Sequence, residues 1–454
     1  METKYDILII GSEISGLVSA ALLAKKGFSV AVVSGREGSP VYEKDGYTLN
    51  ERPSFITGLK GGPLGTLFDE IGVPKDTGIK GASPYQVVLP DERVDVYEEP
   101  ELFHEELRRC FPKEIDKVSD FYNHLSGLNE EIGHVMDLNP FSFRILLPSG
   151  IRKGKRPLRD MAEGLGLSQR FQSFVRAQIS SFSYLDGPTS IMAASSILES
   201  SRKGIYSIEG GLDGLKEMLL KKIESFGGDF IMSPAKEVSR NGNRWLLRTE
   251  EEALSGRVVI GNIDAQIFCG LFLDLRKKYL KSIDRIENSL SPLTVNLGVK
   301  ESGVPVGMAA NVIVLRDYGG KHILDNLILV HMGAPSNGKR GVSITCRVPT
   351  EEYRNGNIRG ISEAMLEGVD ELLPFIDRHI EVLDIRNVEP KGDGIFVTSV
   401  KQKMGIGGLP FEMVRGEIYY AGPEVYPSLG FDGLVYSGKA VAAAALRALT
   451  ANKA

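Results

Sequence analysis

Residues 5–33 read YDILIIGSEISGLVSAALLAKKGFSVAVV. Residues 5–10 form a short apolar run that is typical of a buried strand. Residues 17–26 form an Ala/Leu-rich helix that ends at Gly27, and residues 29–33 form a second apolar strand. A strand, a glycine-containing turn, a helix and a strand within about 30 residues make the βαβ unit of a dinucleotide-binding fold. We therefore predict an α/β protein with a parallel sheet.

Later segments extend this pattern over the rest of the chain. Residues 257–262 and 417–421 each read as another buried strand, and residues 438–449 read as an Ala-rich helix. Residues 240–243 have the sequence RNGN, a hairpin turn signal just before Trp245. No repeat of 20 to 50 residues and no low-complexity segment interrupts these elements.

The composition is that of an ordinary soluble protein of two or three domains. The 454 residues are 42% hydrophobic and 25% charged, which allows sizeable cores. The 59 acidic residues outnumber the 54 basic ones, which argues against nucleic acid as the main partner because phosphate binding needs a clustered basic surface. Residues 152–159 are the densest basic run, and we interpret them as a solvated loop rather than as a contact with an anion or a membrane surface.

The cysteines and the start of the chain indicate the compartment. Cys110, Cys269 and Cys346 lie far apart without a CxxC spacing, so we predict no metal site, and free thiols fit a reducing compartment. The sequence enters a strand directly after Asp6 without a basic and then apolar leader. No apolar run approaches the roughly 20 residues that span a bilayer. We predict a cytoplasmic protein with at most peripheral membrane contact.

Several segments together resemble one known group of proteins, the phytoene desaturases, carotenoid isomerases and flavin amine oxidases. The resemblance covers about half of the chain, in segments 5–33, 42–49, 85–112, 204–219, 258–264 and 418–446. It implies a Rossmann-like FAD/NAD(P)-binding fold of the glutathione-reductase/amine-oxidase type with an inserted α+β substrate domain. The expected boundaries are 1–75, 205–285 and 385–454 for a discontinuous FAD-binding-like domain, and 76–204 and 286–384 for a substrate-like domain.

The group binds FAD, and the phosphate end of that site departs from its pattern here. In the turn at residues 11–16, Gly11 and Gly16 keep the glycines for the tight turn and for close helix packing, and Ser12 lies between them. The middle glycine, which lets the backbone approach the pyrophosphate, is Glu13. A carboxylate about 4 Å from a phosphate costs on the order of 4 kcal/mol at an effective dielectric near 20. Ser34 stands where the group has an acid for the adenosine ribose.

The flavin end of the same site departs as well. Arg52 falls where the group has a glycine before a proline near the flavin ring, so a long cation stands where the ring needs room. The group's Gly-Asp pair is Gly422 and Pro423 here, and proline has neither the acid nor a backbone N–H. Gly430 and Gly433 keep the spacing of the group.

Glu13 and Arg52 suggest two alternative local arrangements. Their charges compensate each other if both side chains reach into the vacated cleft, because buried charges without partners are costly. Alternatively, both side chains point to solvent and the turn has opened.

Other candidate chemistry is sparse. The six histidines lack metal-ligand spacing and a neighbouring nucleophile or base, so we interpret them as surface or locally bonded residues: His104, His124, His134, His322, His331 and His379. Phe182, Tyr184 and Met192 either line an apolar cavity or, as we prefer, belong to the core. Residues 139–150 are interpreted as core packing rather than as a lipid-facing entrance. No catalytic residue is predicted.

These observations leave two classes of function. These four changes, and the loop at residues 35–40 that lacks the Gly-Gly-Arg triplet of the group, converge on one ligand. They favour a flavin-less, non-catalytic binding or scaffold subunit with no cofactor. Such a subunit would pair with a homologous, active flavoprotein or hold an apolar small molecule. The alternative, which the resemblance implies, is an active FAD-dependent oxidoreductase: a desaturase, saturase or isomerase that acts on an isoprenoid or another apolar substrate.

Overall fold

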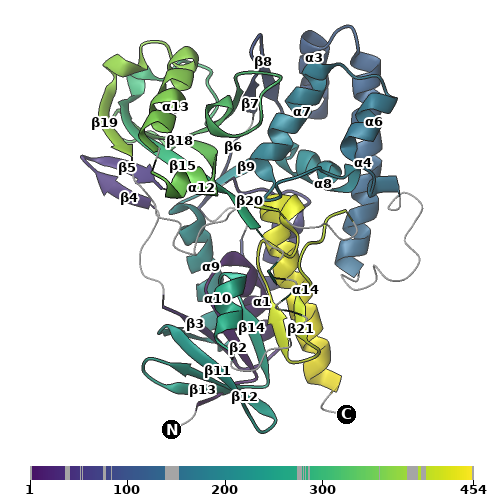
Figure 1. Cartoon of the computed structure of the whole chain (residues 1–454), viewed down its shortest axis with the longest axis vertical. Coiled ribbons are helices and arrows are strands. Elements are labelled where there is room, and N and C mark those ends of the chain that lie inside the picture. Colours follow the sequence, from purple (N-terminus) through teal and green to yellow (C-terminus); the bar gives the residue numbers. More distant parts are fainter. Residues whose placement is uncertain are drawn as a thin grey trace.

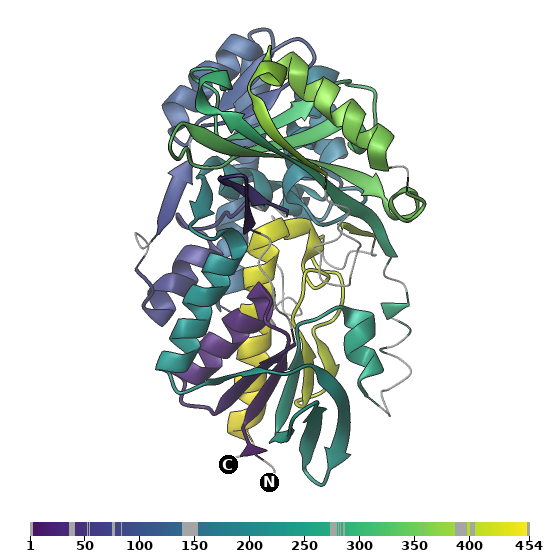
Figure 2. The same ribbon diagram turned by 90° about the vertical axis from the view of Figure 1, so that its left-hand side faces the viewer.

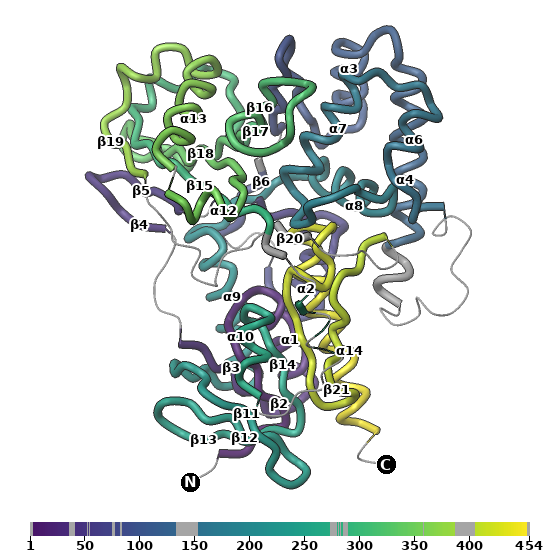
Figure 3. Tube along the Cα trace, viewed as in Figure 1, coloured from purple at the N-terminus to yellow at the C-terminus, as the bar shows by residue number. Residues whose placement is uncertain are grey.

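The protein has two lobes, each built around its own sheet (Figure 1). In this computed structural model the described residues are 3–35, 41–51, 53, 55–74, 78–82, 84–138, 153–272, 279, 281, 283–284, 287–356, 358–385, 397–399 and 405–451. Both termini lie at the far end of the lower lobe, as the chain trace shows (Figure 3).

The lower lobe is organised by a six-stranded sheet of order β10-β3-β2-β14-β22-β21. The first five strands are parallel to one another and β21 is antiparallel to β22. In that order the strands are Asp229–Met232, Val30–Ser34, Ile7–Ile10, Val258–Gly261, Ile418–Tyr420 and Glu412–Val414. Helix α1 (Ile14–Lys25) connects β2 to β3, so the predicted βαβ unit and the parallel sheet are confirmed.

Alternate residues of these strands enter two different cores. One face of β2 and β14 packs against helices α1, α2 (Pro63–Ile71), α9 (Gly211–Ser225) and α14 (Gly430–Ala451). The other face packs against helix α10 (Ala265–Gly270) and a second sheet of order β1-β13-β12-β11. That sheet consists of Thr3–Lys4, Ala253–Gly256, Arg244–Thr249 and Ala235–Asn241. Figure 2 shows the helices on one side of the parallel sheet and the second sheet on the other.

The upper lobe is built on a larger, mostly antiparallel sheet of order β19-β15-β18-β17-β16-β7-β8, with β20 also paired to β15. These strands are Ile380–Ile385, Glu287–Lys300, Lys339–Pro349, Leu327–Met332, Asn311–Leu315, Tyr85–Val88, Arg93–Val96 and Val397–Ser399. Helix α13 (Ile358–Leu372) packs on this sheet in one core. A second core joins β7, β8 and β16 to five helices, α3 (Pro100–Cys110), α4 (Ile115–Leu138), α6 (Leu158–Gly164), α7 (Gln169–Phe182) and α8 (Ile191–Arg202).

Two short pairs of strands involve the N-terminal part of the chain. Strands β4 (Val41–Lys44) and β5 (Tyr47–Asn50) pair with each other and lie against β15 and β18. The hydroxyl of Tyr47 donates to Glu381 on β19 at 2.6 Å. Strand β6 (Ile79–Ala82) pairs with β9 (Ile205–Ile208) between the lobes. The exact domain boundaries given above stay a prediction.

Two expectations about secondary structure need adjustment. Helix α1 begins at Ile14 instead of residue 17, and helix α14 begins at Gly430 instead of residue 438. The predicted start at residue 438 is late because Gly430 and Gly433, which have low helix propensity, lie in the first turn of α14. Phe182 and Met192 are buried in the cores, as preferred from the sequence, and residues 139–150 lie outside the described residues.

No described helix combines the length and the apolar character needed to cross a bilayer. The cytoplasmic location stays a prediction.

Helices α1 and α14 cross at Gly438 with almost no space between their backbones. A Cβ atom at Gly438 would lie 2.5 Å from the Ser15 carbonyl oxygen and 2.6 Å from the Cβ of Val18. The Gly438 carbonyl also accepts a hydrogen bond from the Ser19 hydroxyl at 2.9 Å. The position therefore requires glycine for packing.

We expect Gly438→Ala to lower the free energy of unfolding by about 1–3 kcal/mol, because the added methyl group forces the two helices apart. Gly127 is the matched control, since it lies on the exposed face of α4 with open space around it. Gly127→Ala is expected to raise stability by roughly 0.5–1 kcal/mol through helix propensity. Urea unfolding measures both, and equal stabilities for the two variants would contradict the packing argument.

Candidate functional site

A cavity of about 450 Å³ opens at the C-terminal edge of the parallel sheet, beside the N-terminus of α1. This is the edge where open α/β sheets bind their ligands. Six of the ten positions predicted from the sequence line it: Gly11, Ser12, Glu13, Ser34, Gly422 and Pro423. Three of the other four do not. Gly16, Gly430 and Gly433 lie in packed regions nearby, and Arg52 lies outside the described residues.

The two outer glycines of the first turn are fixed by Asn262, which follows β14. A Cβ atom at Gly11, whose φ is +108°, would collide with the Asn262 carbonyl oxygen, and one at Gly16 would collide with its side-chain oxygen. The Asn262 carboxamide donates to the Ala421 carbonyl at 2.6 Å. Sequence reasoning did not single out Asn262, because its partners are distant in the chain.

Glu13 stands at the N-cap of α1 without capping the helix. Its carboxylate lies 2.9 Å from the ammonium group of Lys216 on α9, and Lys216 also lies 3.5 Å from Asp213. The Lys216 side chain is 13% exposed and that of Glu13 is 35% exposed. The charge of Glu13 is therefore compensated by a lysine that the sequence did not indicate. The pairing of Glu13 with Arg52 stays a prediction.

Ser34 is buried at the end of β3, where the ribose contact was expected. The Ser12 hydroxyl donates to the Ser34 hydroxyl at 3.0 Å. This bond links the β2–α1 turn to the neighbouring strand, so one hydrogen-bonding position of Ser34 is already occupied.

Next to Pro423, the carboxyl group of Glu424 lies buried in the wall of the cavity. Burial raises the pKa of Glu424 to about 7, while the hydrogen bond that it accepts from the Tyr420 hydroxyl at 2.7 Å acts in the opposite direction. An acid whose pKa is about 7 therefore lies one residue after the position where the group has its aspartate.

The N-terminus of α14 contains a second buried acid, Asp432. It accepts a hydrogen bond from Thr57 at 2.8 Å, and burial raises its pKa to about 6. The positions on both sides of Asp432 require glycine. A Cβ atom at Gly430 (φ +56°) would collide with the carbonyl oxygen of Phe182, and one at Gly433 would collide with that of Tyr426.

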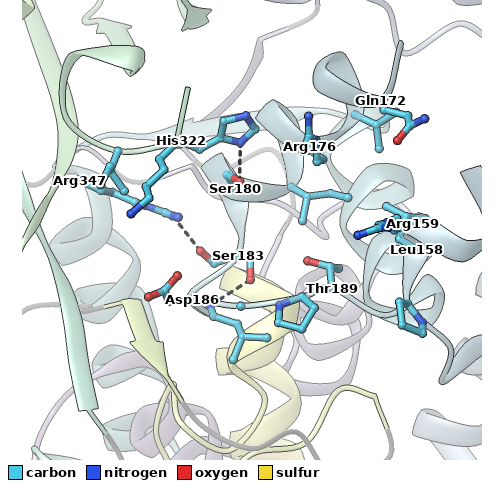
Figure 4. Close-up of a pocket in the computed structure, with 18 of the residues that line it drawn as sticks. Leu158, Arg159, Gln172, Arg176, Ser180, Ser183, Asp186, Thr189, His322 and Arg347 are labelled. Carbon is cyan, nitrogen blue, oxygen red and sulfur yellow. Dashed lines mark hydrogen bonds between the residues drawn. The ribbon is translucent and has the colours of Figure 1, made fainter. Parts of the chain in front are cut away.

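A larger cavity of about 830 Å³ lies in the upper lobe, above the N-terminus of α14 (Figure 4). Its walls come from α6, α7, the loop that follows α7, the segment after β16, and the ends of β15 and β18. The guanidinium of Arg347 donates to the Ser183 carbonyl at 2.8 Å, and burial lowers its pKa to about 10. None of the residues proposed from the sequence as cavity-lining contributes to this wall.

His322 also belongs to this wall. A ring nitrogen lies 2.9 Å from the Ser180 hydroxyl, so the histidine is locally bonded as expected but faces a cavity. Burial, with Arg176 next in effect, lowers the pKa of His322 to about 4, which keeps the ring neutral. Among the described residues, no group of three or more histidines, cysteines and acids is arranged to hold a metal ion.

Comparison with known proteins places these cavities in context. No protein-family model matches the chain. It is 32% identical over 128 residues to prolycopene isomerase 2, chloroplastic, of an Oncidium hybrid cultivar, and 33% identical over 129 residues to the prolycopene isomerase of Daucus carota. Each match covers 26% of this chain and only 22% or 21% of the relative, so the chain spans about a fifth of those proteins.

Solved structures match over nearly the whole chain. A putrescine oxidase triple mutant covers 98% of this chain and 100% of its own, with a TM-score of 0.68 and 14% identity. Cyclohexylamine oxidase from Brevibacterium oxydans covers 99% and 100%, with a TM-score of 0.64 and 13% identity. The chain has the fold of the phytoene desaturase and flavin amine oxidase group. The family resemblance and the fold class predicted from the sequence are thus confirmed.

A third neighbour of the phytoene desaturase and amine oxidase fold is an oxidoreductase from Methanosarcina mazei, with a TM-score of 0.63, 16% identity, and coverage of 97% of this chain and 99% of its own. At identities this low, the structural likeness establishes the architecture alone. Folds of this kind have their nucleotide site at the C-terminal edge of the parallel sheet, where the 450 Å³ cavity lies.

We expect Glu424→Gln to change how stability depends on pH. Because the folded-state pKa of Glu424 is about 7 and its ordinary value is 4.5, the native state holds a proton in this window that the unfolded state releases. Stability from this group is thus present below pH 4.5 and is lost as pH rises through about 7. Relative to the variant, the wild type should lose up to about 3 kcal/mol across the window.

Urea titrations of both proteins at several pH values measure this difference. Asp432→Asn is a matched comparison, because its own window should close lower, near pH 6. Parallel pH profiles of the wild type and Glu424→Gln would show that Glu424 is ionised normally in the fold.

Proposed function

We propose that this protein is a flavin-less member of the group that works by binding a ligand or a partner. The observation that carries the proposal is the carboxylate of Glu13 at the phosphate end of the nucleotide cleft. The expected partners are a homologous, active flavoprotein in a hetero-oligomer and an apolar small molecule.

The position of Glu13 opposes a diphosphate in two ways. The N-terminus of a helix attracts an anion through its free N–H groups and its dipole, and a carboxylate at the N-cap offsets that attraction. Lys216 compensates the charge of Glu13 at 2.9 Å, but the side chain still occupies space where the group has a glycine. A diphosphate in this place would have to break the ion pair or displace both side chains.

The remaining contacts also fit FAD poorly. Ser34 offers a hydroxyl that is already bonded to Ser12, whereas a ribose needs a strong acceptor. Pro423 supplies no backbone N–H. The residues present therefore do not suit FAD in the pose of the group.

A second candidate is an FAD-dependent oxidoreductase that acts on an apolar substrate. Two observations favour it: a cavity of 450 Å³ persists at the nucleotide edge of the sheet, and the structures that match over the full chain are named oxidases and an oxidoreductase. FAD would then bind in a shifted pose that tolerates Glu13.

Visible absorption of the purified protein distinguishes these candidates. After incubation with excess FAD and desalting, we expect no bands near about 370 and 450 nm, the usual signature of a bound flavin. Bands that stay with the protein would overturn the proposal and support the oxidoreductase.

We further expect the combined substitution Glu13→Gly and Pro423→Asp to create FAD affinity. Removing the carboxylate at position 13 and introducing an aspartate at position 423, where the group has one, should strengthen FAD binding at least about tenfold, which corresponds to roughly 1.4 kcal/mol. Fluorescence titration with FAD measures this gain. Glu13→Gln separates charge from volume, and Glu217→Gln, on the exposed surface of α9, is the control for net charge. Unchanged affinity in the double variant would show that these two positions do not decide flavin binding.

A further inference from the structure

The upper cavity is lined by both apolar and cationic side chains. Its apolar side chains include Phe121, Leu158, Phe171, Val175, Ile179 and Leu185. Its cationic side chains are Arg159, Arg176, Lys321 and Arg347, and Asp186 is the acid among its lining residues. Figure 4 shows Arg159, Arg176 and Arg347 at different places around the cavity, with Asp186 near its lower edge.

Arg347, like Arg244, has no acidic partner at ion-pair distance among the described residues, whereas Arg340 and Arg202 each have one. The Nη2 of Arg347 donates to the carbonyls of Ser183 and Ser181, at 2.8 and 3.3 Å. Its Nε and Nη1 make no hydrogen bond with the described residues. On the same strand, Arg340 donates to the carboxylate of Glu301 at 2.8 Å.

The absence of an acidic partner matters because a charged group removed from water is costly unless it is paired. Arg202, which is 17% exposed, pairs with Glu199 at 3.1 Å, so Arg202 and Arg340 both have the carboxylate partner that Arg347 lacks. Arg347 instead directs its free donors toward a cavity.

The other cationic side chains of the wall also favour an anionic ligand. Arg176 lies at the rim and donates to the hydroxyl of Ser173 at 3.1 Å rather than to a carboxylate. Arg159 is paired with Glu163 at 2.6 Å, and Lys321 is exposed. His322 is close enough to both Arg176 and Arg347 for each to disfavour its protonation, which places the two guanidinium groups around one region of the wall.

We propose that this cavity binds an amphipathic carboxylate. Its head group is held beside His322 by Arg347 and Arg176, and its apolar chain lies along the side formed by α7. The planar fork of an arginine matches a carboxylate and can donate two parallel hydrogen bonds to it. The volume of 830 Å³ falls within the range of about 300–1,000 Å³ that is usual for small-molecule sites.

This assignment rests on the proposed binding function, because it names an amphipathic carboxylate as the ligand that such a protein binds. It does not depend on the nucleotide cleft, because the residues that carry it come from the upper lobe. An uncharged ligand would leave Arg347 unpaired, and an ammonium ligand would face a surplus of positive charge.

The test is calorimetric titration of the full-length protein with dodecanoate, dodecanol, dodecylamine and dodecyl phosphate, each below its aggregation concentration. We expect dodecanoate to bind at least about tenfold more tightly than dodecanol, and dodecylamine to bind least. Equal affinity for dodecanoate and dodecanol would overturn the proposal. A preference of more than about tenfold for dodecyl phosphate over dodecanoate would replace the carboxylate by a phosphate head and would overturn it too.

Substitutions locate the head group. Arg347→Met should weaken dodecanoate at least about tenfold while leaving dodecanol unchanged, a pattern that a general loss of structure would not produce. Arg176→Gln, at the exposed rim, gives an independent reading if Arg347→Met does not fold. Arg359→Gln, on the exposed surface of α13, is the matched control and should change nothing. Unaltered dodecanoate affinity in both cavity variants would overturn the assignment.

Titration of FAD into the same preparation separates the two proposals. If the protein binds dodecanoate and also retains FAD, the flavin-less function is contradicted and the cavity assignment is supported. If it binds neither FAD nor dodecanoate, only the cavity assignment is contradicted.

Discussion

The close approach of three backbone segments at the start of α1 is the constraint on which the lower lobe depends. Gly11 and Gly16 lie against Asn262, and Gly438 lies against the first turns of α1. Asn262 in turn bonds the carbonyl of Ala421, so one side chain links the first, middle and last parts of the parallel sheet. These contacts leave no space for side chains, and they fix where the N-terminus of α1 points. The shape of the nucleotide cleft follows from packing and does not require a nucleotide.

This separation explains why the fold and the ligand contacts have different fates in the sequence. Glycines that touch backbone atoms cannot change without moving a helix. Glu13, by contrast, faces open space, and Lys216 on α9 lies close enough to neutralise it. The cleft keeps the shape typical of the fold, but the ion pair of Glu13 and Lys216 lies beside the N-terminus of α1. In the group, this helix N-terminus attracts a phosphate. Two acids near the cleft are buried, Glu424 in the cavity wall and Asp432 at the N-terminus of α14, and burial raises the pKa of each.

Local patterns allowed much of the fold to be predicted. The apolar run at residues 5–10, the glycine-containing turn and the helix after it are encoded within one short segment, and so is the hairpin before Trp245. The start of α14 was predicted eight residues late, since Gly430 and Gly433 read as loop residues although they are required by neighbouring carbonyl oxygens. Lys216, Asn262 and Arg347 were missed for a different reason. Each acquires its role from a residue far away in the chain or from a cavity wall assembled by several elements, and neither has a signature in linear spacing.

The order of strands in the parallel sheet has a consequence for the newly made protein. Strand β2 lies between β3 and β14, and β22 adds next to β14. The first strand of the sheet thus waits for a neighbour that is synthesised some 250 residues later, and the helix that covers both belongs to the end of the chain. Until those later segments are synthesised, the apolar surfaces of β2 and α1 lack part of their native contacts, and such surfaces promote aggregation. The upper lobe, whose strands β15 to β19 follow one another closely, can pair before β22 and α14 are made. The polypeptide therefore completes its lower lobe last, although that lobe contains its first residues.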